Sequence, residues 1–353
     1  MFARDRAFAE FQDSYDYATR TSHHYLSPVT PDGRLDVTSL GPGGMAPAGC
    51  TSSLRQPTSA GGWTNADPAN RYNEASANYL YTPSARWTVF ATGGNRINDQ
   101  VSLFVEGLYL HRDSARTFDS VPFDGQVPIS KDSLYNPTGA DILDYRRRLT
   151  DLAPRSYADE INTTRLVLGL CGELPDAWGA VAGWPFEVSF NWGNVTSLTH
   201  SDGQFDTFHA RTGLGPSMLD ASGQPICVRV PGDASTQIFY MIFVMDAPKL
   251  IPCTPLDILA APGKIPKAQV AKFRLDENAG GTDEQQTLLA TTGGKLVDLP
   301  DRGEIALTAG AQYRYELGTV DPTGGASTGY TSALQAFRTN FRFHVYEGFA
   351  ELA

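Results

Sequence analysis

Two clusters of residues in this sequence have side chains that could take part in binding chemistry. His23 and His24 could supply half of a metal site, but the residues around them do not follow a metal-ligand spacing, which favours a solvated loop. Arg146, Arg147 and Arg148 lie in a short helical-looking stretch and could bind phosphate. A solvated face or local ion pairs is the simpler interpretation of such a charge run. Neither cluster defines a reaction.

Other motifs give no stronger chemical signal. Residues 213–217 read Gly-Leu-Gly-Pro-Ser, but they lack the spacing of a phosphate-binding loop, so we predict a turn. The four cysteines, Cys50, Cys171, Cys227 and Cys253, form no C-x-x-C pair and have no histidine at metal-ligand spacing, so zinc is not expected. With no H-E-x-x-H and no Walker loop, we predict neither an enzyme nor a cofactor.

The elements that must position any site are β-strands, because two stretches alternate apolar and polar residues with a period of two. The apolar positions of residues 184–193 and 305–316 include Phe186, Val188, Phe190, Ile305, Leu307 and Ala311. The intervening polar positions include Glu187, Ser189, Asn191, Gln312, Arg314 and Glu316. A strand of about ten residues with this pattern is typical of an outer-membrane barrel. We therefore predict that the first set faces lipid and the second faces an aqueous lumen. Glu187 and Glu316 are then separate lumen-facing carboxylates, not a catalytic pair.

The order of elements supports a barrel over a soluble sandwich. Three hairpins are predicted, followed by a last strand from about residue 340. Their strands cover residues 87–94 and 100–111, 159–173 and 184–196, and 284–299 and 304–316. Residues 1–84, 112–158, 197–282 and 317–339 are expected to be loops, with a short helix near residues 205–212. Outer-membrane barrels alternate short and long connections in this way.

Composition agrees with a β-rich chain. Charged residues are 19% of the 353, below the roughly 25% of an average protein, and there are 34 Gly and 23 Pro. The net charge of −11 argues against a nucleic-acid partner. No apolar run is long enough for a transmembrane helix; the longest, residues 238–245, is too short.

The chain resembles the barrel region of TonB-dependent outer-membrane receptors, in a proteobacterial subgroup. The resemblance rests on short stretches in family order across nearly the whole chain. They are residues 71–73, 82–90, 101–109, 135–139, 147–149, 165–170, 214–217, 253–256, 299–300, 310–314 and 346–352. Each stretch alone is weak, whereas the ordered set is specific.

The resemblance implies an all-β fold: a partial, open segment of a large antiparallel transmembrane barrel, with an early extracellular loop region at 1–84 and about seven strands over 85–353. It also implies a location in the cell outer membrane, contact with its lipid, and energy from the TonB system through an N-terminal region. Signal peptide, plug and further strands are expected to be missing, as in an internal fragment. A disulfide between Cys227 and Cys253 is implied on the oxidising outer side. The transported nutrient, a metal chelate or an oligosaccharide, stays open.

A soluble all-β ligand-binding protein, such as a carbohydrate-binding sandwich, is the alternative. Its strands would be nearer five or six residues long, and its apolar faces would be covered.

Overall fold

The computed structural model describes residues 27–43, 54–58, 62–67, 71–79, 81–125, 127–228, 253–299 and 303–353. His23, His24, Cys50 and the apolar run 238–245 lie outside these residues. Among the described residues, no helix has both the length and the apolar character needed to cross a membrane.

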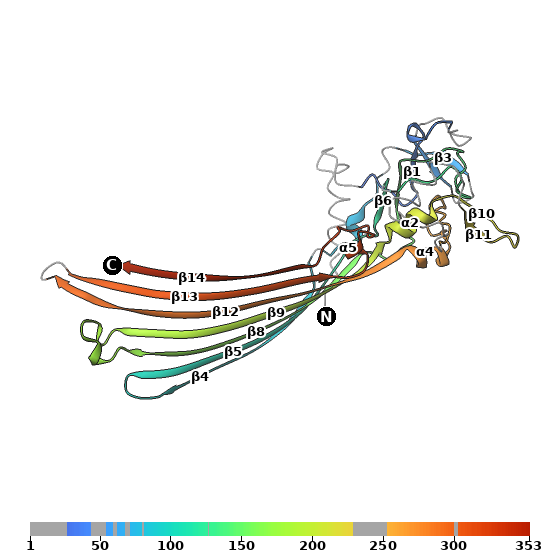
Figure 1. The fold of residues 1–353 in the computed structure, drawn as a ribbon. Coiled ribbons are helices and arrows are strands. Elements are labelled where there is room, and N and C mark those ends of the chain that lie inside the picture. The colour runs from blue at the N-terminus through green and yellow to red at the C-terminus, as the bar shows by residue number, and fades with distance from the viewer. Residues whose placement is uncertain are drawn as a thin grey trace.

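Seven long strands form one antiparallel sheet in the order β14-β13-β12-β9-β8-β5-β4. They are β4 (Ser84–Arg96), β5 (Val101–Thr117), β8 (Ser156–Glu173), β9 (Pro185–Phe205), β12 (Arg274–Leu299), β13 (Gly303–Pro322) and β14 (Thr339–Leu352). Each strand pairs with the next long strand along the chain, so the sheet is an up-and-down meander. The sheet is curved (Figure 1). It is not closed: no described residue pairs with the outer edge of β4 or β14.

The predicted hairpins are confirmed, but the strands are longer than the sequence pattern indicated. β9 continues to Phe205 and β12 already begins at Arg274, about ten residues beyond the predicted ends. In these extensions both faces of the sheet carry Ser, Thr, Asp, Asn and His. Because apolar and polar residues no longer alternate there, the pattern stops although the hydrogen-bonded ladder continues.

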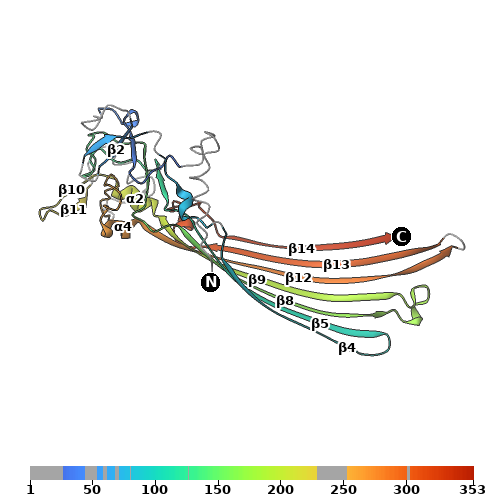
Figure 2. The same ribbon diagram turned by 180° about the vertical axis from the view of Figure 1, so that it is seen from behind.

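The long connections gather at one end of the sheet, and the short turns lie at the other (Figures 1 and 2). The short turns are residues 97–100 and 174–184, the latter containing the 3-10 helix η4 (Asp176–Val181). We call the described parts of the long connections, residues 27–83, 118–155, 206–228, 253–273 and 323–338, the loop lobe.

The loop lobe contains its own small sheets and helices. One antiparallel sheet has the order β3-β2-β1-β7-β6, and β10 pairs with β11. The strands are β1 (Arg34–Asp36), β2 (Leu54–Pro57), β3 (Trp63–Asn65), β6 (Pro122–Asp124), β7 (Tyr145–Arg148), β10 (Ser217–Leu219) and β11 (Pro225–Cys227). The helices are η2 (Val37–Ser39), η3 (Glu74–Ala77), α2 (Thr207–Gly213), α4 (Lys267–Phe273) and α5 (Gly325–Thr328).

The loop lobe has a hydrophobic core, which the sequence analysis did not predict. Leu35, Phe123, Ile142, Leu214 and Ile258 are all at most 1% exposed and belong to one cluster. These residues come from three long connections that are distant from one another in the sequence. The core therefore exists only once these distant segments have come together.

Candidate functional site

The register of the long sheet separates its side chains into two faces, because directly opposed residues of antiparallel strands point to the same side. Phe190 lies opposite Leu168 and Leu288, and Val188 lies opposite Leu170 and Ala290. The six residues predicted to face lipid all fall on this side, which we call the apolar face. They are Phe186, Val188, Phe190, Ile305, Leu307 and Ala311.

The middle of the apolar face is uncovered. The side chains of Val188, Phe190 and Leu288 are 39%, 40% and 47% exposed. On the same face, the rings of Trp87 and Tyr109 lie 5.0 Å apart. Exposed aliphatic side chains beside aromatic ones are the arrangement that a lipid-facing strand region requires.

The six residues predicted to face a lumen fall on the opposite side, the polar face. They are Glu187, Ser189, Asn191, Gln312, Arg314 and Glu316. Through β12, Asn191 aligns with Arg314, and Ser189 aligns with Gln312. Glu187 aligns with Gly310, six residues from Glu316, or about 20 Å along the strand. The two carboxylates therefore cannot act together.

Hydrogen bonds connect the polar side chains across strands. Arg165 donates from Nε to Oδ1 of Asn191 at 2.9 Å. Gln285 donates to Glu316 at 3.1 Å, and Nε of Arg314 lies 3.0 Å from Oε1 of the same carboxylate. Gln312 donates to Glu347 at 3.2 Å. The polar face therefore presents hydrogen-bond donors and acceptors that a polar ligand can contact.

Aromatic rings share the polar face, and the sequence analysis missed them. Phe341, Phe343 and Phe349 of β14 point to this side. A Cβ built on Gly318 would lie 2.2 Å from the Phe341 ring, and one on Gly310 would lie 2.4 Å from the Phe349 ring. These rings therefore lean across β13 over its glycines. The available signal was three phenylalanines at odd positions of β14, two of which, Phe341 and Phe349, lie opposite glycines of the preceding strand.

The loop lobe packs against the lobe end of the polar face. Glu277 of β12 is 6% exposed, and its carboxylate accepts a hydrogen bond from the Thr331 hydroxyl at 3.0 Å. The neighbouring Gln204 is buried and accepts one from Ser332 at 2.9 Å. Residues 323–338 are thus held to the sheet by buried polar contacts.

Replacing Glu277 with Gln is expected to strengthen this attachment at pH 7. Burial raises the pKa of the Glu277 carboxyl above its ordinary 4.5, against the opposing effect of the Thr331 hydroxyl. The folded state then binds this proton more tightly than the unfolded state, so the group's contribution to stability falls as the pH rises above about 4.5. Proteolysis of residues 323–338 should be measured from pH 4 to 8. We expect Glu277→Gln to be cleaved more slowly than the unmodified protein at neutral pH, and at the same rate at pH 4. Equal protection at every pH would contradict this.

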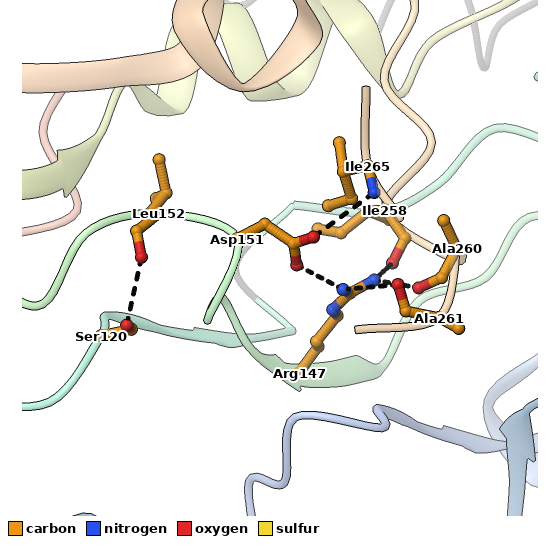
Figure 3. A network of polar contacts seen from close by, with 8 residues as sticks. All are labelled: Ser120, Arg147, Asp151, Leu152, Ile258, Ala260, Ala261 and Ile265. Carbon is orange, nitrogen blue, oxygen red and sulfur yellow. Dashed lines mark hydrogen bonds and ion pairs between the residues drawn. The ribbon is translucent and has the colours of Figure 1, made fainter. Parts of the chain in front are cut away.

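The arginine cluster is structural, and its expected helix is instead the strand β7 (Figure 3). The side chain of Arg147 is fully buried and donates hydrogen bonds to the carbonyl oxygens of Ile258, Ala260 and Ala261. It also forms an ion pair with Asp151, with an N–O distance of 2.5 Å. Arg148 is also buried. It donates to the carbonyl of Ser120 at 3.0 Å and pairs with Glu74.

Only Arg146 fits the solvated interpretation, with ion pairs to Asp124 and Asp144. Because Arg147 and Arg148 have their donors turned into the lobe, the cluster does not present a phosphate site.

The remaining motifs are also structural. Residues 213–217 connect the last residue of α2 with the first residue of β10, which agrees with the predicted turn. Residues 325–329 read G-x-S-x-G, a spacing that the sequence analysis passed over; Ser327 lies in the one-turn helix α5 and donates to the Gly324 carbonyl at 2.9 Å. No histidine among the described residues hydrogen-bonds to this serine. A nucleophile elbow would need such a base.

Cys227 and Cys253 are joined in a disulfide, the pairing that the resemblance implied, with a Cα–Cα distance of 6.1 Å. Cys171 is a free thiol on the polar face, opposite Glu187. Within the described part of the chain, no group of three or more His, Cys, Asp or Glu has the arrangement of a metal site.

Comparison with known proteins adds no assignment. No model of a protein family matches the chain, and no curated protein matches it. The polar face, with the loop lobe at its end, is the candidate functional site on geometry alone.

Proposed function

We propose that this chain is a segment of a TonB-dependent outer-membrane receptor, a transporter for active uptake of a large nutrient. The strands would form part of the barrel wall, the apolar face would meet lipid, and the loop lobe would stand outside the cell. TonB would act through an N-terminal region of the parent protein.

One observation carries the proposal: an uninterrupted antiparallel sheet of long strands with an uncovered apolar middle. The strands have 13 to 26 residues, enough to cross a bilayer and to continue beyond it on the lobe side. The opposite face is polar and hydrogen-bonded across the strands. A continuous exposed apolar surface over several long strands is unfavourable in water and favourable in lipid.

A carbohydrate-binding sandwich fits these features less well. Its strands are typically five or six residues long, and a second sheet covers its apolar face. Among the described residues, the small lobe sheets stand beyond the end of the long sheet instead of across its middle (Figures 1 and 2).

Labelling of adjacent residues on opposite faces tests the proposal. We expect a fluorophore at Val188→Cys or Phe190→Cys to be quenched by brominated lipid, because these residues lie on the apolar face. The same fluorophore at Ser189→Cys or Asn191→Cys should be quenched by aqueous iodide. The protein would be the full natural chain in vesicles, with Cys50→Ser and Cys171→Ser in every variant. Equal iodide quenching at positions 188 and 189, in a soluble monomer, would overturn the proposal.

A further inference from the structure

We infer that the polar face of β13 and β14 is a binding track for a neutral oligosaccharide. This inference deepens the proposed function, on which it rests, by naming the class of transported ligand. Three features of this strip carry it: accessible aromatic rings, hydrogen-bonding side chains between them, and the balance of charge.

The rings form the apolar half of the track. Phe341, Phe343 and Phe349 are 43%, 41% and 47% exposed. The rings of Phe341 and Phe343 are 6.2 Å apart and inclined by only 22°. Because Phe341 and Phe349 lean over Gly318 and Gly310, one surface of each ring is supported by the sheet. The C–H groups on one face of a pyranose carry partial positive charge and are attracted to the negative face of an aromatic ring.

Polar groups, together with Val345, occupy the interval between the rings. Phe343 lies directly opposite Glu316, and Glu347 lies opposite Gln312. Glu316 and Arg314 are only partly buried, with side chains 21% and 34% exposed. Carboxylates accept hydrogen bonds, guanidinium groups donate them, and amides do both. Sugar hydroxyls also donate and accept hydrogen bonds, so each hydroxyl can find a hydrogen-bond partner along this strip.

The charge of the strip favours a neutral ligand over an anionic chelate. Arg314 of β13 lies within ion-pair distance of Glu316 on the same strand. Glu347 adds one further carboxylate, hydrogen-bonded to the neutral Gln312. An anion would therefore meet no excess positive charge here. From Phe341 to Phe349 the track extends about 27 Å, which suits several linked sugar units better than a single compact molecule.

The test is binding of the full natural chain, in detergent, to an array of neutral and anionic oligosaccharides, followed by calorimetry with the strongest neutral hit. We expect saturable binding of a neutral oligosaccharide. Phe343→Ala should raise its Kd about tenfold, and Phe343→Tyr, which keeps the ring, should restore binding. Tyr346→Ala is the matched control, because Tyr346 lies on the same strand but on the apolar face. Its Kd should stay within about twofold of the unmodified protein.

Binding of anionic members only, binding of none, or equal effects of Phe343→Ala and Tyr346→Ala would overturn the inference. Melting temperatures of the variants separate loss of the ring from loss of the fold. The lipid and iodide labelling above is independent of any sugar. A protein that passes the labelling test but binds no neutral oligosaccharide contradicts the track alone, whereas failure of the labelling contradicts the receptor.

Discussion

Replacing Arg147 with Met is expected to destabilise the loop lobe by about 3–5 kcal/mol, because it leaves the buried carboxylate of Asp151 without its counter-ion. The same guanidinium satisfies three carbonyl oxygens of residues 258–261, which would lose that partner. Urea unfolding followed by proteolysis of residues 253–273 measures the loss. We expect this segment to be cleaved at much lower urea concentration than in the unmodified protein.

Arg146→Met is the matched control one residue away. Arg146 is about half exposed and pairs with carboxylates that water also reaches, so its loss should cost at most about 1 kcal/mol. Adding Asp151→Asn to Arg147→Met should recover part of the stability, since the uncompensated charge is then removed. Equal effects of the two single substitutions would show that burial of Arg147 does not stabilise the lobe.

In the receptor proposed above, replacing Val188 with Arg is expected to cost about 2–4 kcal/mol in lipid, because the charge would lie on the apolar face near the bilayer midplane. Ser189→Arg should cost much less, since the adjacent residue points to the polar face. Refolding into vesicles across a urea series gives both free energies of unfolding. Similar losses at the two positions would mean that both faces have the same environment and would contradict the assignment of the faces.

The two substitutions concern different parts of the molecule. Arg147 acts within the loop lobe, where segments distant in sequence share one core. Val188 lies in the long sheet, whose strands pair with their neighbours along the chain. We therefore expect Arg147→Met to leave the lipid labelling at position 188 unchanged.

The long strands and their faces were predictable from the sequence, because a strand's period of two is a local property. Residues 186–191 and 305–316 assign each side chain to a face without reference to any other part of the chain. The ends of the strands were less predictable, since β9 and β12 continue through residues that are polar on both faces.

Tertiary structure alone decided the lobe and the aromatic track. Leu35, Ile142 and Ile258 meet in one core although more than a hundred residues separate each from the next, and no local pattern indicates such a meeting. The sequence pattern indicated that Arg147 is solvated, whereas in the structure residues 258–261 enclose its side chain. Phe341 and Phe349 became part of a candidate site only when strand pairing set them over Gly318 and Gly310. Alternation fixes which way a side chain points, whereas what it meets depends on long-range packing.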